Sequence, residues 1–248
     1  MKLPENWDFY FEEDEDGPMS IFVNIGLHQI APIKKYLNLL CISIRYTSKE
    51  NGFPTSDDLD RLSILEEEII PTLWKKFKAI QVGHITSKGT RDFFIYFKEK
   101  VQIDNILSGP FRSFPSSTYH FSEDKNWDLF LMVLMPSEEQ YQLMQNRRVL
   151  RNMEKHGDTL QKLREVSHWA YFEKQEDQCS FEKAVKKDNF KVLRKRFNKE
   201  DKLRYEIVFS RLDKVDYDEV NIYTTSLYKL AKDFNGYYDG WECKSFTE

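Results

Sequence analysis

Glycine and proline are scarce in this sequence of 248 residues, with 9 and 8 copies respectively. Flexible and extended linkers depend on these residues, so we expect no long linker. Cysteine is scarcer still, because only Cys41, Cys179 and Cys243 occur, far apart and without a Cys-x-x-Cys pair. This spacing argues against a disulfide framework and against a zinc knuckle. It is typical of reduced thiols, and we expect a cytoplasmic protein.

Long apolar runs are also missing. The longest is LFLMVLM at 129–135, well short of the roughly 18 residues that indicate a membrane span. Its length suits a buried strand. The N-terminal residues have no apolar signal core and turn acidic at once. We therefore expect no association with a membrane.

The common catalytic motifs are absent as well. The sequence has no Gly-x-Gly-x-x-Gly, Walker loop, His-Glu-x-x-His or Gly-x-Ser-x-Gly. Its five histidines do not lie at metal-ligand spacing from one another. We therefore expect no cofactor, no metal and no enzymatic activity.

The sequence is rich in aromatic and charged residues. Aromatic residues make up 15% and charged residues 31%, enough apolar mass for one or two cores under a charged surface. Residues 1–135 hold 15 Lys+Arg and 20 Asp+Glu, whereas 136–248 hold 22 and 21. The acidic first half disfavours binding to nucleic acid by bulk electrostatics. It can dock a basic partner, or it can simply keep the protein soluble.

Hydrophobic periodicity predicts an α+β domain over 1–135. Alternating apolar residues around an acidic turn indicate an N-terminal β-hairpin. The segments that follow read as strand, helix, strand, strand, helix and strand, which is the ferredoxin-like βαββαβ order. The final strand is expected to form a hairpin that turns at 123–126 and ends in the apolar run at 129–135. The other expected segments are strands at 36–46, 79–86 and 90–97 and helices at 56–77 and 98–107.

A second ferredoxin-like domain is predicted over 136–248. Pro136 and Ser137 open a leading helix at 137–156, which connects the two halves. The pattern then repeats the βαββαβ order, so both domains are expected to have antiparallel sheets. The expected strands are 164–172, 190–197, 204–212 and 237–246, and the expected helices are 179–188 and 217–234.

The closing strand raises a question about function. In a ferredoxin-like sheet the last strand lies antiparallel beside the first, so 237–246 should pair with 164–172. Period-2 alternation puts His168 and Ala170 on the helix-facing side of the sheet. The aromatic residues between and after them, Trp169 and Tyr171, then lie on the open side. Trp241 should share a face with Asp239, opposite Tyr238. Gly240 suggests a bulge or a close backbone approach, and Asp239-Gly240 can also form a local turn. The candidate partner-binding residues are Trp169, Tyr171, Tyr238, Asp239 and Trp241. The alternative is that these aromatics pack in the core.

A basic stretch favours a different function. Residues 186–204 hold nine Lys+Arg and three acidic residues, with phenylalanines between them. Basic strands with aromatics on a βαββαβ sheet can bind single-stranded RNA by stacking and phosphate contacts. The alternative is a solvated basic edge, whose charges discourage aggregation. The candidate RNA-binding residues are Lys191, Arg194, Lys195, Arg196 and Phe197.

A third and least favoured hypothesis is a hydrolase. His168 can lie near Asp239 across the strand pair, where the carboxylate would orient the imidazole as an acid–base group. A structural histidine with a satisfied hydrogen bond is the favoured interpretation of the same residue.

Two stretches resemble known families. GDTLQKLREVSHWAYF, followed by LAKDFNGYYDGWE, resembles the RraB family of regulators of ribonuclease E activity. VGHITSKGTRDFFIYF and the entry hairpin resemble domain of unknown function 695, a bacterial domain that often precedes an RraB-like domain. The resemblance implies a small, cytoplasmic, non-enzymatic protein that binds and inhibits a ribonuclease. It brings no catalytic residues with it.

Overall fold

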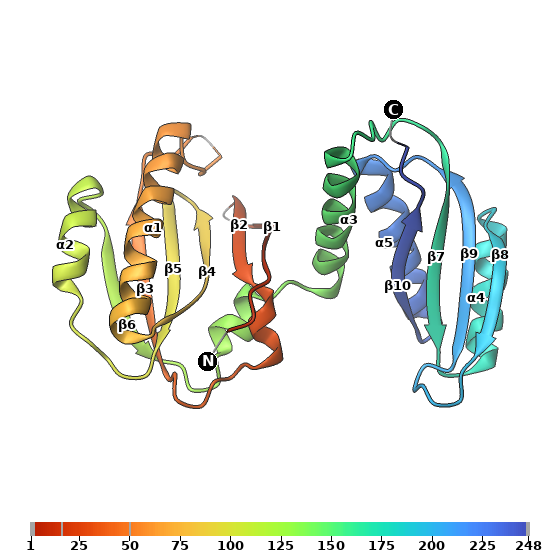
Figure 1. The fold of residues 1–248 in the computed structure, drawn as a ribbon, viewed down its shortest axis with the longest axis horizontal. Helices are drawn as coiled ribbons and strands as arrows, with labels where there is room; N and C mark the ends of the chain where they lie inside the picture. Colours follow the sequence, from red (N-terminus) through yellow and green to blue (C-terminus); the bar gives the residue numbers. More distant parts are fainter. Residues whose placement is uncertain (1–2, 16, 50, 247–248) are drawn as a thin grey trace. The chain divides into compact units, whose positions relative to one another are not determined.

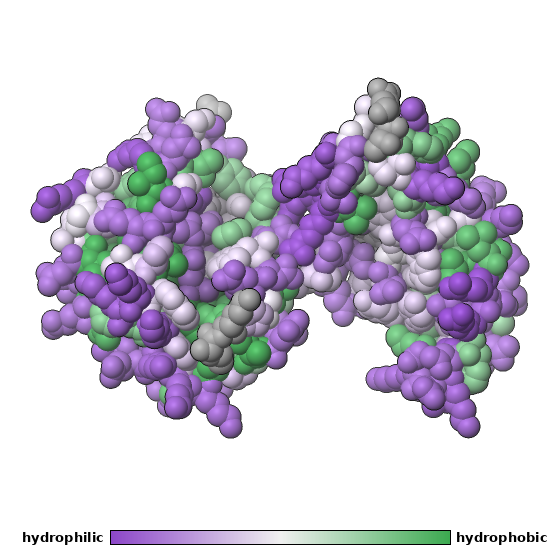
Figure 2. Space-filling model, viewed as in Figure 1, coloured by the Kyte–Doolittle hydropathy of each residue, from purple (hydrophilic) through white to green (hydrophobic). Residues whose placement is uncertain are grey.

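The computed structural model describes residues 3–15, 17–49 and 51–246. The chain divides into two compact units, Met1–Pro136 and Ser137–Glu248. Each unit has one antiparallel sheet with helices packed against it (Figure 1). The visible surface of both units is mostly hydrophilic, with apolar residues in small groups (Figure 2).

The first unit is built on a six-stranded sheet of order β1-β2-β4-β5-β3-β6. Its last four strands have the ferredoxin-like order, and the N-terminal hairpin extends the sheet beyond β4 through antiparallel pairing of β2 with β4. This confirms the predicted fold with its added hairpin. The elements are β1 (Trp7–Asp14), β2 (Gly17–Asn24), η1 (Ile25–Gln29), β3 (Asn38–Arg45), α1 (Ser56–Phe77), β4 (Ile80–Ser87), β5 (Thr90–Phe97), α2 (Asp104–Ser113), β6 (Thr118–Glu123) and η2 (Leu129–Leu134).

Helix α1 forms the centre of the first core. Thr55 caps it by accepting a hydrogen bond from the backbone N–H of Asp58. Its apolar residues recur at helical spacing, and Leu62, Ile69 and Leu73 are all buried. They pack with α2 on the face of the sheet that carries the alternate apolar residues of β3 and β5. The opposite face is covered in part by η1 and η2.

The prediction of a strand at 129–135 is wrong. This run forms η2, a π-helical segment, and no hairpin follows β6. Phe130 and Leu134 are fully buried, whereas Met132 is 80% exposed. In a strand Met132 would share a face with Phe130 and Leu134, so its exposure between them excludes strand alternation and fits a helical repeat. Trp127 stacks on Tyr96 with ring centroids 4.1 Å apart. This contact directs the chain after β6 back against the sheet.

The second unit has a four-stranded sheet of order β10-β7-β9-β8. This is the ferredoxin-like order, and β10 pairs antiparallel with β7 as predicted. Ser137 caps the leading helix by accepting a hydrogen bond from the backbone N–H of Gln140. The elements are α3 (Glu138–Lys155), β7 (Arg164–Phe172), α4 (Gln175–Lys187), β8 (Lys191–Phe197), β9 (Tyr205–Asp213), α5 (Tyr217–Asp233) and β10 (Gly236–Cys243).

All three helices of the second unit pack on one face of its sheet. Ala170 and Phe172 of β7 share a core with side chains of α4 and α5. Val166 of the same strand shares a second core with Leu150 of α3 and Val220 of α5. Because these three β7 residues alternate along the strand, they lie on the same side of the sheet. The other side is covered by no helix of the described part of this unit.

A buried ion pair closes the end of the second unit. Asp158 and Arg164 are bonded in a two-pronged geometry, with Nη1 to Oδ2 at 2.6 Å and Nη2 to Oδ1 at 3.0 Å. Each side chain is only 1% exposed. The Asp158 carboxylate also accepts hydrogen bonds from the backbone N–H groups of Leu160 and Phe246. The pair therefore ties the α3–β7 connection to the segment after β10.

Candidate functional site

The helix-free side of the second sheet is the first candidate site, and we call it the free face. Trp169 and Tyr171 lie on it, because they alternate with the buried residues of β7. Both are partly exposed. The register places Val208 and Glu206 of β9 directly beside them, and Tyr237 of β10 opposite Tyr171. Three aromatic side chains of two neighbouring strands therefore gather on this face.

Glu206 connects the aromatic and the basic parts of the free face. Its Oε1 accepts a hydrogen bond from Nη2 of Arg194 at 2.9 Å, and its Oε2 lies 3.5 Å from the Tyr171 hydroxyl. Burial raises the pKa of Tyr171, with Asp239 and Glu206 raising it further. The tyrosine therefore stays protonated at neutral pH and can donate a hydrogen bond. The positive charge of Arg194 is offset in place by Glu206.

The predicted RNA-binding residues divide between the two sides of β8. The register places Lys191, Arg194 and Arg196 on the free face and Lys195 and Phe197 on the helix side. Lys195 pairs there with Glu182 of α4 at 2.6 Å. One phosphate-tracking surface therefore cannot use all five of these side chains at once.

A bulge in β10 changes the predicted faces of the closing strand. The register shifts between Tyr238 and Gly240, and Gly240 has a φ of +123°. This backbone conformation favours glycine, so the predicted bulge is confirmed. Because the bulge adds a residue, Trp241 turns to the same helix side as Tyr238. The predicted opposition of these two residues is wrong, since period-2 alternation holds only up to the bulge.

Tyr238 and Trp241 are consequently held inside the second unit. Tyr238 is 1% exposed, and its hydroxyl is hydrogen-bonded to Nδ1 of His168. Trp241 packs against the core under α3 and donates from Nε1 to Oδ1 of Asn146 at 2.8 Å. The five residues predicted to bind a partner therefore do not form one surface. Trp169 and Tyr171 share the free face, and Asp239 lies exposed at the bulge.

Asn146 of α3 explains why Trp241 is fixed. This amide is 1% exposed, and its nitrogen donates to Oδ1 of Asn221 at 2.9 Å and to Oγ1 of Thr224 at 2.7 Å. Its oxygen accepts from Trp241, so donors and acceptor are all used. The network locks α3 and α5 against β10. No sequence pattern indicates this network, because asparagine in a helix is typical of an exposed position.

A groove between α3 and β10 is the second candidate site, and we call it the rim groove. Its volume is about 330 Å³. Tyr141 and Tyr237 are 38% and 51% exposed, so two aromatic rings border it with much of their surface accessible. Sequence reasoning did not select either residue. Because Tyr237 also lies on the free face, the two sites are continuous. The groove is lined by Tyr141, Gln142, Gln145, Asn146, Val149, Tyr237, Asp239, Gly240 and Trp241.

His168 is unsuited to acid–base catalysis. It is fully buried, and its ring contacts the rings of Phe190, Phe209 and Tyr223. Burial, together with the positive charge of Arg211, lowers its pKa to about 3. Its Nδ1 is engaged with Tyr238 and not with Asp239, which lies exposed on the bulge. The predicted His168–Asp239 pair is therefore wrong, because burial excludes the substrate and the water that a hydrolase requires.

Two further features of the described ranges concern ligands and membranes. No three His, Cys, Asp or Glu side chains in them are grouped so that they could hold a metal ion. None of the helices they contain is long and apolar enough to cross a bilayer.

Comparison with known proteins gives two family matches. The model of DUF695, a family of unknown function, matches residues 5–135. The model of RraB, described as regulator of ribonuclease activity B, matches residues 143–243. The predicted order of the two domains is therefore confirmed. No curated protein matches this chain. A crystal structure of an unknown protein from Galdieria sulphuraria is similar at 8% identity, covering 84% of this chain and 98% of that one with a TM-score of 0.23.

Proposed function

We propose a function from the premise that this chain belongs to the DUF695 family, a family of unknown function, and that its residues 143–243 match the RraB family. The chain is a regulatory protein without enzymatic activity, and its second unit binds a protein partner. The partner that the RraB match favours is a ribonuclease, whose activity the chain would lower. The DUF695 unit would add a second surface or select the partner.

The free face carries this proposal. Trp169 and Tyr171 stand on a sheet surface that the helices of the second unit leave uncovered, beside Val208 and Tyr237. Tryptophan and tyrosine provide large contact areas at a small cost in conformational entropy, and they dominate the energetics of many interfaces. Arg194 and Glu206 add a charged pair that can orient the partner.

The mechanism is steric and needs no covalent chemistry. A folded sheet that docks over the active site or the RNA channel of a ribonuclease excludes the substrate for as long as it stays bound. The rim groove lies next to the free face and can receive a side chain of the partner. Its Asp239 is exposed and offers a carboxylate to an arginine or lysine of that partner.

The proposal is tested by capture followed by an activity assay. The purified chain is immobilised, nuclease-treated lysate of its native cells is passed over it, and a retained ribonuclease is identified. The same ribonuclease is then assayed on RNA with increasing amounts of the chain. The proposal is supported if the chain slows cleavage and the inhibition saturates at a fixed molar ratio of chain to ribonuclease. Failure to retain a ribonuclease, or retention without any effect on cleavage, overturns it.

A second candidate function is direct RNA binding. The observation in its favour is that Arg194, Arg196 and Lys191 of β8 lie on the same face as Trp169 and Tyr171. Bases could stack on the aromatics while the basic side chains contact phosphates. The salt dependence of the binding affinity distinguishes this function from the first. Phosphate contacts release counterions, so the affinity for RNA falls steeply as the salt concentration rises.

A further inference from the structure

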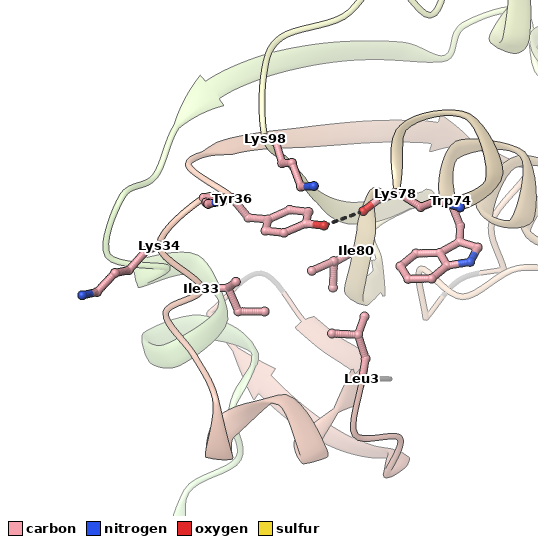
Figure 3. A pocket seen from close by; sticks show the side chains of 9 residues that line it. Leu3, Ile33, Lys34, Tyr36, Trp74, Lys78, Ile80 and Lys98 are labelled. Carbon is pink, nitrogen blue, oxygen red and sulfur yellow. Dashed lines mark hydrogen bonds between the residues drawn. The ribbon is translucent and has the colours of Figure 1, made fainter. Parts of the chain in front are cut away.

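The first unit contains a cleft that the proposed function does not use. Its volume is about 560 Å³, and it lies where the end of α1 meets the segment between η1 and β3. Apolar side chains of separate segments turn toward one space in it (Figure 3). Trp74 is 41% exposed at this place, unlike Ile80, which is buried. The volume of the cleft and its mainly apolar lining are typical of a small-molecule site. The apolar lining consists of Leu3, Ile33, Tyr36, Trp74 and Ile80.

One wall of the cleft is held rigidly. The Tyr36 hydroxyl donates to the backbone carbonyl of Lys78 at 3.0 Å, shown as a dashed line in Figure 3. At the other end of the residue, Nε1 of the buried Trp127 donates to the Tyr36 carbonyl at 2.7 Å. The tyrosine ring is therefore fixed before any ligand arrives. A preformed wall reduces the entropy that binding must overcome.

The charges around the cleft are all of one sign. Every charged residue in its lining is a lysine, although residues 1–135 as a whole hold 15 Lys+Arg and 20 Asp+Glu. Within 3–15, 17–49 and 51–246, no ion pair joins any of these lysines to a carboxylate. An acidic unit thus has an unneutralised positive cluster at this cleft. The four are Lys34, Lys35, Lys78 and Lys98.

Two of these lysines are held at the aromatic walls. Nζ of Lys98 lies 5.5 Å from the ring centroid of Tyr36, and Nζ of Lys78 lies 5.5 Å from that of Trp74. Such cation–π contacts keep the ammonium groups beside the cleft. Lys34, by contrast, points away from it (Figure 3). Lys78 and Lys98 are therefore the cations positioned to meet a ligand.

The dipole of α1 accounts for only part of this cluster. The C-terminus of a helix attracts cations, which explains Lys75 and Lys76 in the last turn and favours Lys78 at the C-cap. Lys98 follows β5 and belongs to no helix. The cation–π contact holds its ammonium group beside Tyr36, where it can meet a bound anion.

We propose that this cleft binds a small organic anion with an apolar body. The body would lie against Trp74, Tyr36 and Ile80, and the anionic group would be placed between the ammonium groups of Lys78 and Lys98. A carboxylate, a phosphate or a sulfonate on an aromatic or alkyl group has this chemistry. Burial of the apolar body supplies most of the affinity, and the lysines select for negative charge.

The test uses the fluorescent probe 8-anilinonaphthalene-1-sulfonate, which carries an aromatic body and a sulfonate. The full-length chain is titrated with the probe, and its circular dichroism confirms that it remains folded. Decanoate, decyl phosphate and decanol then compete for the probe. The first two differ in the anionic group, and the alcohol lacks a charge. Inorganic phosphate tests the anion without an apolar body.

Matched variants locate the binding. Trp74→Ala should abolish saturable probe binding, and Lys78→Gln with Lys98→Gln should weaken it by about fivefold, the loss expected for two exposed charge contacts. Lys75→Gln with Lys76→Gln, which removes two lysines of the same helix outside the cleft, should leave the dissociation constant unchanged.

Each outcome decides the proposal. It is supported if both decyl anions displace the probe at least fivefold better than decanol and only the cleft variants weaken binding. It is overturned if the wild-type chain shows no saturable binding, if decanol competes equally, or if Trp74→Ala binds like the wild type. Ribonuclease capture is not part of this assay, so this proposal and the proposed function can fail separately.

Discussion

The hydroxyl of Tyr238 lies 2.8 Å from Nδ1 of His168, inside the core of the second unit. This contact joins β10 to β7 through two side chains that could each have served a functional site. Both are at most 1% exposed. The pair stabilises the sheet edge, and our proposal assigns contact with a partner to Trp169 and Tyr171 on the opposite face.

The burial of His168 makes the second unit sensitive to acid. Its pKa is lowered from 6.5 to about 3 in the folded chain, so between these values the unfolded state binds a proton that the folded state does not. Stability is therefore fully present above pH 6.5 and falls as the pH drops toward 3. From pH 7 to 5 the loss should be on the order of 2 kcal/mol. This loss of stability is measured by hydrogen exchange of the β7 amides, in the wild type and in His168→Phe at each pH. A loss of the same size in the variant would contradict this assignment.

Trp241 should matter for stability more than for binding. Trp241→Phe leaves the buried Oδ1 of Asn146 without its donor and should cost about 1–3 kcal/mol. Trp241→Ala also removes the packing under α3 and should cost more. Urea unfolding gives both values. Tyr237→Phe, in the same strand but 51% exposed, is the control and should change the free energy of unfolding by less than about 0.5 kcal/mol. Equal effects of Trp241→Phe and the control would refute the role of the network.

The Asp158–Arg164 pair should be costly to break. Asp158→Asn leaves an arginine that is 1% exposed without its counter-charge, and we expect a loss of about 3–5 kcal/mol. The Arg164 guanidinium holds the pKa of Asp158 well below its usual range. Its stabilisation is therefore present above pH 3.8 and lost as the pH falls below that value. Thermal unfolding at pH 7 tests the variant, with the exposed Glu123→Gln as control. A loss below 1 kcal/mol would contradict the prediction.

RNA binding should be weak, because the chain already neutralises part of β8. Glu206 pairs with Arg194, and Glu182 pairs with Lys195. In an anisotropy titration with a single-stranded oligouridine, Glu206→Gln should bind more tightly than the wild type, since it frees Arg194. Tight wild-type binding would favour the RNA function instead. In that case Arg196→Gln should reduce the salt slope by about one.

The elements with clean periodicity were predictable from the sequence. The strand at 164–172 was located with its bounds, and the alternation of Val166, His168, Ala170 and Phe172 on the helix side is confirmed. Pro136 and Ser137 predict the start of the leading helix, and the structure shows Ser137 at its N-cap. In each case the local sequence pattern and the tertiary packing favour the same structure.

The remaining features depend on contacts that no local pattern encodes. The run at 129–135 has the length and composition of a strand, but Trp127 packs on Tyr96 and the run becomes η2. Gly240 indicates the bulge, but the face of Trp241 does not follow from the sequence, because period-2 alternation does not continue through a bulge. The lysines of the cleft come from three separate places in the chain and meet only in the fold.

The central claim is that the second unit captures a protein partner through the free face. The most direct measurement compares three immobilised chains in nuclease-treated native lysate: the wild type, Trp169→Ala with Tyr171→Ala, and Ile222→Ala. Ile222 is 64% exposed on α5 and serves as an apolar control on the helix side. We expect a ribonuclease on the wild type and the control and a loss of at least tenfold on the double variant, with all three chains folded. Equal retention by the double variant, or no ribonuclease on the wild type, would contradict the account.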